Sequence, residues 1–343
     1  MKYDALVVVS FGGPDGPEDV LPFLENVLRG RNVPRERMLE VAEHYYHFGG
    51  KSPINDQNRQ LIAALERELT SHGLDLPIYW GNRNWHPLLA DTLRQMFADG
   101  IQRALAFVTS AFSSYSGCRQ YREDIARAQQ EVGPAAPQID KLRVFFNHPG
   151  YIETVVARTR DALAQVAAAN RDSALLLFTA HSVPQAMADG CQYETQLREA
   201  CGLVANELGR REWRLVYQSR SGPPNQPWLE PDVLDFIRAS HADQPLHNVI
   251  VVPIGFISDH LEVLYDLDTE AKQTCEQLGV QMVRAATAGT HPRFVAMIRE
   301  LIEERVTENP TRLSLGNLGP KEDVCPDDCC VYTLGRPAAA RQA

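Results

Sequence analysis

The chain has 343 residues, of which 44% are hydrophobic and 23% are charged, a balance typical of globular proteins. Its net charge of −10 argues against a general nucleic-acid-binding protein, because such proteins present a basic surface. No apolar run approaches the roughly 18 residues that span a bilayer, and the N-terminus resembles neither a signal peptide nor a transit segment. We therefore expect a cytoplasmic protein without a transmembrane segment.

Short apolar runs alternate with longer amphipathic segments in the first part of the chain. We expect strands at 5–11, 78–81 and 104–110, and helices at 19–28, 35–47, 55–72, 87–98 and up to about 131. Alternating strands and helices predict a parallel sheet with helices on both faces.

Residues 133–141, rich in Pro and Ala, predict a linker, after which the same alternation recurs. We expect strands at 143–146, 174–180, 213–217, 247–254 and 280–284, and helices at 149–168, 191–208, 230–239, 259–277 and 291–307. The sequence thus predicts an α/β protein with two doubly wound, Rossmann-like domains, residues 1–140 and 141–308, and a cleft between them. The last helix could pack back on the first domain. The tail, residues 309–343, shows neither helical nor strand periodicity. A bound metal that holds the tail in place, or disorder, would explain this.

A histidine follows the most apolar of these strands. Residues 175–178 predict a strand buried on both faces, and His181 comes just after it. Ligands bind at the carboxyl ends of parallel strands in such folds, and histidine exchanges protons near neutral pH. The alternative is a histidine that only hydrogen-bonds within its loop.

Three acidic residues follow another buried strand, 249–256. Glu262, Asp266 and Glu270 are spaced by four, so they form a ridge on a helix that drifts by roughly 40° per step. A π-type bulge would change that alignment, and such bulges favour functional sites. The alternative is a purely structural role, in which Glu262 helps to cap the start of a helix and the other acids belong to its solvent-exposed face. If His181 and Glu262 share one crevice, imidazole and carboxylate suit proton abstraction or transient handling of a divalent metal.

Aromatic and cationic side chains also occur at the expected strand ends. Together, aromatic rings suit a large flat apolar ligand and cations at the rim suit its carboxylates, although each ring taken singly is more often core. The rings are Phe11, Trp85, Tyr115, Tyr121 and Trp228, and the cations are Arg29, Arg31, Lys51 and Arg119.

Six motifs together resemble the ferrochelatase family, in the family's order and over residues 3 to 305. They are residues 10–14, 50–53, 115–121, 178–184, 218–223 and 255–262. The resemblance implies a chelatase-type fold and is strongest to the actinobacterial branch, whose members use coproporphyrin III. It therefore implies insertion of Fe²⁺ into coproporphyrin III in haem biosynthesis, by porphyrin distortion and proton abstraction.

The resemblance also implies roles for individual residues. His181 and Glu262 would be catalytic and would contact the Fe²⁺ substrate, while Asp266 and Glu270 would carry protons or Fe²⁺. Which residue delivers iron and which takes protons stays open. The implied porphyrin contacts are Phe11, Arg29, Arg31, Ser52, Tyr121 and Trp228.

Two departures from the family pattern are visible, and alternatives to coproporphyrin chemistry remain. Phe11 stands where some relatives have an iron-ligating tyrosine, and His44 stands where some have a propionate-binding arginine. The alternatives are a protoporphyrin IX ferrochelatase, a non-catalytic porphyrin or haem carrier, and a cobalt or nickel chelatase of a corrinoid pathway. Transient contacts with other haem-pathway enzymes are expected.

Three of the seven cysteines crowd into the tail, at Cys325, Cys329 and Cys330. This group resembles the tail of family members that hold a [2Fe–2S] cluster with four thiolates. The position of the fourth ligand in animal members falls near Ala157, so the fourth ligand here is unknown. The candidates are Cys118, Cys191 and Cys201, and the alternative is a tail of unligated thiols.

Overall fold

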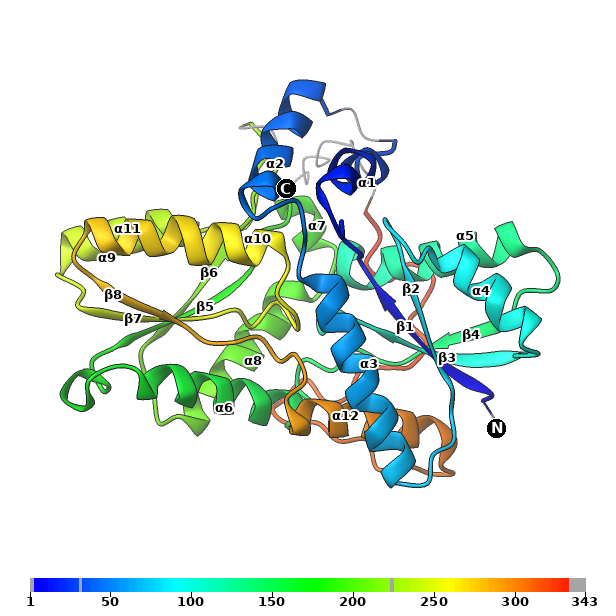
Figure 1. Cartoon of the computed structure of the whole chain (residues 1–343). Coiled ribbons are helices and arrows are strands. Elements are labelled where there is room, and N and C mark those ends of the chain that lie inside the picture. Colours follow the sequence, from blue (N-terminus) through cyan, green and yellow to red (C-terminus); the bar gives the residue numbers. More distant parts are fainter. Residues whose placement is uncertain (1–2, 31–32, 223–224, 333–343) are drawn as a thin grey trace, which may run out of the picture.

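The computed structural model describes residues 3–30, 33–222 and 225–332, which form two parallel sheets flanked by helices (Figure 1). The strand order is β2-β1-β3-β4 in the first sheet and β6-β5-β7-β8 in the second. The strands are β1 (Ala5–Ser10), β2 (Ile78–Asn82), β3 (Arg103–Val108), β4 (Gln138–Lys141), β5 (Leu175–His181), β6 (Trp213–Gln218), β7 (Asn248–Val252) and β8 (Gln281–Arg284). The predicted α/β class with two doubly wound halves is confirmed.

Helices follow nearly every strand, and their bounds agree with the amphipathic segments of the sequence within a few residues. The α-helices are α1 (Val20–Val27), α2 (Arg35–His47), α3 (Ile54–Ser71), α4 (Leu89–Ala98), α5 (Gln120–Val132), α6 (Pro149–Ala164), α7 (Gln185–Asp189), α8 (Tyr193–Glu207), α9 (Val233–Asp243), α10 (Leu261–Val263), α11 (Lys272–Gln277) and α12 (Pro292–Val306). Two π-helical stretches, η2 (Tyr115–Arg119) and η4 (Leu264–Ala271), precede α5 and α11. The short 3₁₀ turns are Pro17–Asp19 and Ala168–Asn170.

The inner strands of each sheet are buried on both faces, as their continuous apolar runs predict. Every residue of β1 and of β7 is buried. Strand β1 pairs in parallel with β2 and β3, and β5 pairs in parallel with β6 and β7. Parallel pairing places the carboxyl ends of neighbouring strands at one edge of each sheet.

The fourth strand of the first sheet lies earlier in the chain than predicted. The structure forms β4 at Gln138–Lys141, inside the expected linker, and 143–146 is not a strand. Strand β4 is a partly exposed edge strand, so it needs no apolar run, and it pairs only with β3. The apolar segment 144–146 is buried because it crosses between the halves, not because it belongs to a sheet. The proposed division at residue 140 stays a prediction.

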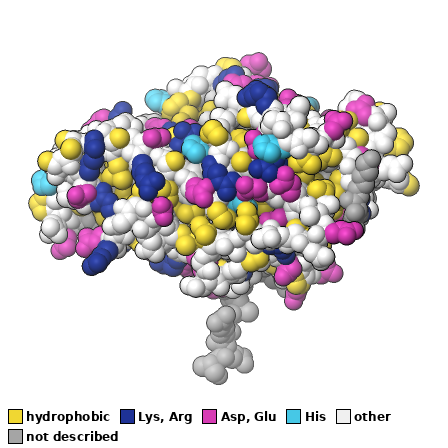
Figure 2. Space-filling view, turned by 90° about the horizontal axis from the view of Figure 1, so that it is seen from below, with side chains coloured by type: hydrophobic (Ala, Val, Ile, Leu, Met, Phe, Trp, Pro, Cys, Tyr) yellow, Lys and Arg dark blue, Asp and Glu magenta, His cyan; other side chains and the backbone are white. Residues whose placement is uncertain are grey.

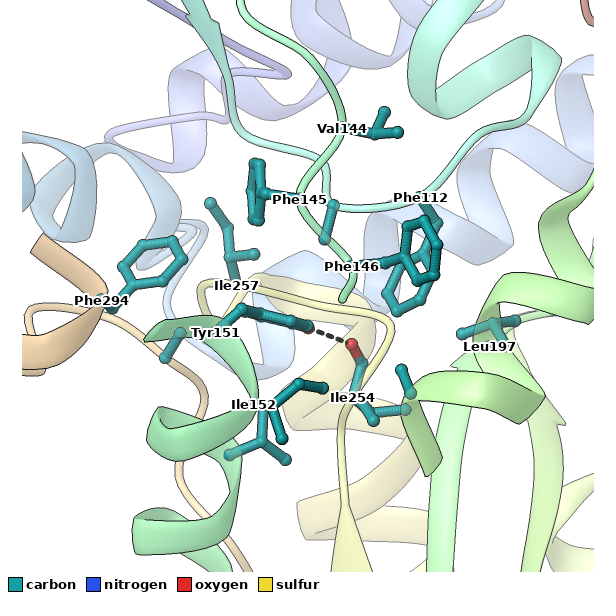
Figure 3. Packing of buried hydrophobic residues seen from close by; sticks show 14 of the residues in the cluster. Phe112, Val144, Phe145, Phe146, Tyr151, Ile152, Leu197, Ile254, Ile257 and Phe294 are labelled. Atoms are coloured by element: carbon teal, nitrogen blue, oxygen red, sulfur yellow. Dashed lines mark hydrogen bonds between the residues drawn. The ribbon is translucent and has the colours of Figure 1, made fainter. Parts of the chain in front are cut away.

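An aromatic core joins the two halves of the molecule (Figure 3). Phe145 stacks on Phe107 with ring centroids 5.5 Å apart and meets Phe294 of α12 edge-on at 6.0 Å. The hydroxyl of Tyr151 on α6 donates a hydrogen bond of 2.5 Å to the carbonyl of Ile254, which follows β7. Side chains from both halves therefore share one core, which fixes the two sheets relative to each other.

Helix α12 links the two halves from below. It packs against α3 of the first half and α6 of the second (Figure 1). Arg293 pairs with Glu153 of α6 at 2.5 Å, and Arg299 pairs with Glu68 of α3 at 2.8 Å. The face seen in Figure 2 accordingly shows acidic and basic side chains interspersed, not one basic field. Among the described residues, no helix is both long enough and apolar enough to cross a lipid bilayer.

The tail returns along the junction of the two halves through specific polar contacts. Arg143 and Glu304 form a buried two-pronged ion pair at 2.7 Å, and the same guanidinium donates to the carbonyl of Leu313 at 2.8 Å. The side chain of Asn147 donates to the carbonyl of Gly319 at 2.9 Å. Residues 309–332 contain no helix or strand, so these contacts, rather than the backbone hydrogen bonds of a sheet, hold this stretch in place.

We predict that Glu304→Gln destabilises the protein by about 3 kcal/mol, because it leaves the charge of Arg143 buried without its partner. The two side chains are only 1% and 5% exposed. The measurement is the free energy of urea-induced unfolding. The matched control is Glu40→Gln in the exposed Arg37–Glu40 pair, which should cost less than about 1 kcal/mol. Equal losses of unfolding free energy in the two variants would contradict the stabilising role given to the buried Arg143–Glu304 pair.

Candidate active site

His181 is the last residue of β5, so it lies at the edge of the second sheet where the carboxyl ends of its strands meet. The amide of Ser182 donates to the carbonyl of Gln218 on β6 at 2.8 Å, and the hydroxyl of Tyr193 donates to the carbonyl of His181 at 3.1 Å. The Nδ1 atom of His181 contacts the carbonyl oxygen of Ser182, which can only accept a hydrogen bond. Nδ1 therefore carries the proton, and the lone pair of Nε2 stays available.

The loop after β7 comes directly onto the end of β5 at a glycine. A Cβ on Gly255 would lie 2.7 Å from the Cα of Ala180, so only glycine allows this approach. The amide of Gly255 also donates to the carbonyl of Thr179 at 3.0 Å. This contact places Glu262 at the beginning of α10 beside His181, with 3.6 Å between Oε2 and Nε2. The predicted pairing of the two strand outlets is therefore present.

A second histidine lies next to Glu262. The Nδ1 atom of His260 is 4.0 Å from the same carboxylate oxygen, and the ring of Phe256 meets the His260 ring at 5.0 Å. Burial lowers the pKa of His260, while the charge of Glu262 opposes that shift and the charge of His181 reinforces it. His260 is therefore a neutral imidazole near pH 7.

The acidic ridge lies on a π-helical stretch. Asp266 and Glu270 both belong to η4, whose hydrogen bonds run from residue i to i+5, so each turn takes more residues than in an α-helix. Burial raises the pKa of Asp266 to about 7; the charges of Glu262 and Glu270 also raise it, and hydrogen bonds from Ser219 and Gln218 lower it. Burial likewise raises the pKa of Glu270. Asp266 can thus hold a proton near neutral pH.

Helix α2 of the first half meets η4, and a pocket of about 480 Å³ lies beside this contact. The ring of His44 stacks on Tyr265 of η4, with centroids 3.7 Å apart and an interplanar angle of 9°. Burial raises the pKa of Tyr45, and the charge of Glu262 contributes to that shift, so α2 reaches the site itself. The pocket is lined by Glu43, His44, Tyr46, His47 and Tyr265.

The predicted porphyrin contacts of the first half differ in their exposure. Phe11, directly after β1, is 37% exposed, whereas Ser52 is 3% and Tyr121 is 4% exposed. A Cβ on Gly13 would lie 2.7 Å from the Cβ of Ser52, so these two loops pack tightly. In this structure only Phe11 of the three presents much of its side chain to solvent.

Trp228 is partly buried, Arg29 lies at the surface, and Arg31 lies outside the described residues. The indole of Trp228 covers Gly222, where a Cβ would lie 2.3 Å from Nε1, and Trp228 forms a bridge with Pro184 next to the His181 loop. Arg29 is exposed and donates to Asn26 at 2.5 Å.

Five of the seven cysteines gather where the tail meets η2 and α7. Sγ atoms of Cys329 and Cys330 are 3.5 Å apart. A hydrogen bond from Cys118 is the main cause that lowers the pKa of Cys325 to about 7, and a hydrogen bond with Cys330 lowers the pKa of Cys191. Cys201 is fully buried in α8, and no tail thiol contributes to its pKa. As the side chains stand, no group of three or more His, Cys, Asp or Glu residues in the described part of the chain is arranged to hold a metal ion.

The tail loop is fastened by two arginines of the first half. Arg119 donates to the carbonyls of Asp327 and Cys329, at 2.5 and 3.0 Å, and Arg122 donates to the carbonyl of Pro326 at 3.3 Å. The sequence suggested Arg119 as a rim cation for ligand carboxylates. Its guanidinium is instead occupied by the tail and by Glu123, because both are within reach of η2.

Arg83 is a buried charged residue that the sequence analysis did not single out. It follows β2 and pairs with Asp124 at 2.5 Å, and the two side chains are 6% and 5% exposed. The only signal in the sequence was a cation among amides and aromatics, residues 82–85, at a strand end.

The profile of the ferrochelatase family matches residues 3–306. The chain belongs to the ferrochelatase family. It is 61% identical to the ferrochelatase of Rhodopirellula baltica, over 98% of this chain and 96% of that protein. It is 50% identical to the coproporphyrin III ferrochelatase of Streptomyces coelicolor, again over 98% and 96%.

Solved chelatases share the fold of this ferrochelatase-family chain. The sirohydrochlorin chelatase SirB of Bacillus subtilis subspecies spizizenii, in complex with cobalt, superposes with a TM-score of 0.51 at 11% identity. That match covers 88% of this chain and 95% of SirB. CbiX, described as the terminal enzyme of sirohaem biosynthesis in denitrifying bacteria, gives a TM-score of 0.50 at 14% identity, over 88% and 100%. At these identities the likeness concerns the fold alone.

We predict that Asp266 makes stability fall as pH rises. Its folded pKa of about 7 lies above the ordinary 3.8, so the folded state binds the proton more tightly, and stability is lost between about pH 4 and pH 7. Asp266→Asn mimics the neutral carboxyl and should gain on the order of 2 kcal/mol at about pH 8, allowing for partial exposure, and nothing near pH 4. Urea unfolding at both pH values measures this, and identical pH dependence in the two proteins would contradict it.

Proposed function

We propose that this protein inserts Fe²⁺ into coproporphyrin III to give its iron complex, as a ferrochelatase of haem biosynthesis. The observation that carries the proposal is the 3.6 Å separation between His181 Nε2 and Glu262 Oε2 across two strand outlets. Membership of the ferrochelatase family and about 50% identity to proteins named coproporphyrin III ferrochelatases support it.

His181 is the proposed acceptor of a pyrrole proton. Metal insertion replaces two N–H protons of the macrocycle, so a base must lie within reach of the ring nitrogens. Nδ1 of His181 is held by the carbonyl of Ser182, which leaves Nε2 as the accepting atom. Glu262 stabilises the imidazolium that forms, and its carboxylate can also contact the incoming Fe²⁺.

The ridge is proposed to carry charge between the site and solvent. Asp266, with a pKa of about 7, can accept a proton near neutral pH and release it again. Glu270 lies one turn further along η4, and its pKa is raised as well. The oxygen atoms of both carboxylates are also suitable contacts for Fe²⁺. The ridge is therefore proposed to carry protons out of the site, Fe²⁺ into it, or both.

The remaining proposed residues hold the macrocycle. Phe11 and Trp228 would contact its faces and edges. Ser52 and Tyr121 are proposed contacts that lie deeper, since they are only 3% and 4% exposed. A planar porphyrin hides its nitrogen lone pairs in the ring plane, so gripping and bending it exposes them to a metal from one side.

Exposed cations support the tetracarboxylate substrate. Coproporphyrin III carries two more propionates than protoporphyrin IX. Arg29 is exposed just after α1, and Lys51 is half exposed and pairs at the surface with Asp56, at 2.6 Å. Arg31 was proposed for the same role and lies in a part of the chain that is not described. These cations are suitable partners for the extra carboxylates.

We predict faster turnover of coproporphyrin III than of protoporphyrin IX, by at least about tenfold in kcat/KM, because each charge-assisted hydrogen bond contributes about 1.5 kcal/mol or more. The measurement is an anaerobic assay with Fe²⁺ that follows the loss of free-base fluorescence. Preference for protoporphyrin IX would overturn the substrate, and binding of both without insertion would indicate a carrier.

We predict that His181→Ala lowers kcat by about 10²-fold or more while it leaves the Kd for coproporphyrin III within about threefold, because the imidazole acts on protons rather than on binding. His241→Ala is the matched control, since this histidine lies at the end of α9 and should leave both constants unchanged. Turnover retained by His181→Ala would remove His181 from the proposed chemistry.

We also propose a [2Fe–2S] cluster bound by Cys325, Cys329, Cys330 and one further thiolate. The fit rests on the two thiols of the folded core that contact the tail cysteines, Cys118 and Cys191, because a cluster needs four thiolates and five meet here. A lowered pKa of Cys325 favours the thiolate form that such ligation requires. When bound, the cluster would supply iron–sulfur cross-links that staple the tail to the core.

We predict that one of Cys118→Ser and Cys191→Ser abolishes the visible absorption and the reduced-state EPR signal of the cluster, while Cys201→Ser retains both. The reason is that Cys201 is buried in α8, away from the tail. Anaerobically purified wild-type protein that is colourless and iron-free would refute the cluster.

The cytoplasmic location and the transient contacts with other haem-pathway enzymes belong to the same proposal. An enzyme of this kind must receive a free-base porphyrin from the reaction before it and pass an iron porphyrin to the next.

A further inference from the structure

Arg83 and Asp124 form a buried ion pair that stability alone does not explain. Removing two charges from water costs several kcal/mol per ion, and apolar residues of similar volume often stabilise a protein equally well. The pair is nevertheless closed, at 2.5 Å and with side chains 6% and 5% exposed. Its position immediately after β2 suggests that the guanidinium fixes the positions of neighbouring side chains.

The guanidinium of Arg83 lies over two aromatic rings. Its Cζ atom is 4.6 Å from the centroid of Tyr121 and 5.6 Å from that of Phe11. Its Nη1 atom donates to the carbonyl of Ser116 in η2 at 3.3 Å. Phe11 follows β1, Arg83 itself follows β2, and Ser116 and Tyr121 both follow β3. One flat cation therefore ties together the ends of these three strands.

Phe11 is the outermost ring of this arrangement and the one that faces solvent. It is 37% exposed, and its other close aromatic neighbour, Phe23, meets it edge-on at 6.2 Å. Its carbonyl accepts from the amide of Asn84, at 3.2 Å, the residue next to Arg83. A phenylalanine cannot ligate iron, so its contribution to a macrocycle is a flat apolar surface, which must be held at a fixed tilt to be useful.

We propose that Arg83 is a positioning residue that fixes the ring of Phe11 as the floor for the porphyrin, with Tyr121 as the support beneath and Asp124 as the counter-ion. This inference rests on the proposed porphyrin function. The guanidinium is planar and stacks on aromatic faces, and a lysine ammonium does not, so charge alone is insufficient.

The test is a double-mutant cycle on porphyrin affinity without metal. The probe is free-base coproporphyrin III, followed by its fluorescence, with the full chain. Arg83→Lys keeps a positive charge beside Asp124 and should raise Kd about tenfold, and Phe11→Leu should do the same. Because Arg83 acts through Phe11, the double variant should bind no more weakly than Phe11→Leu alone, whereas a general structural role would give additive losses.

The matched control is Arg127→Ala. Arg127 pairs with the other oxygen of Asp124 and is 68% exposed, so its loss should leave Kd unchanged. If Arg83→Lys fails to fold, Tyr121→Leu tests the stack from below, since it removes the supporting ring and keeps the ion pair. Unchanged affinity in Arg83→Lys or Tyr121→Leu, or additive effects in the cycle, would overturn the inference. Wild-type protein that binds no porphyrin would overturn both this inference and the proposed function.

Discussion

The close approach of the β7 loop to the end of β5 is the contact on which the site depends. At Gly255 the two backbones come so near that a Cβ would overlap Ala180. Because α10 begins a few residues later, this contact sets the distance between His181 and Glu262. The aromatic core and α12 then hold the first half against the second, so residues more than a hundred positions apart, such as His44 and Tyr265, come into contact.

Burial raises the pKa of two carboxyls at this site, Asp266 and Glu270. A carboxylate in water at neutral pH is a poor proton carrier, but the pKa of Asp266 is raised to about 7 by removal from water and by neighbouring acids. His260 is kept neutral by burial, so it adds no competing positive charge beside His181 and Glu262. The π-helical stretch η4 carries Asp266 and Glu270, and burial raises the pKa of both carboxyls.

The sequence was most informative where burial is two-sided and motifs are local. The runs that form β1 and β5, and the residues just after them, follow from apolar continuity, and His181 and Glu262 follow from position at strand ends. The sequence was least informative where contacts between distant residues determine the local structure. Strand β4 is a partly exposed edge strand, so its four residues carry no apolar signature and were taken for a linker.

The same limit explains the residues whose partners lie far away in the chain. Arg119 looked like a free rim cation, because nothing local shows that the tail, more than 200 positions later, occupies it. Arg83 was overlooked, since its partners belong to the ends of other strands. The meeting of Cys118 and Cys191 with the tail cysteines likewise depends on the path of residues 309–332 across both halves.

The central claim is that His181 and Glu262 act as one unit on the macrocycle. The most direct test is the kcat/KM for iron insertion into coproporphyrin III by His181→Ala, Glu262→Gln and the double variant, measured anaerobically. If the two residues work together, the double variant will be about as slow as the slower single variant, as for other catalytic residues that depend on each other. Losses that multiply would show that the two side chains contribute independently and would contradict the account.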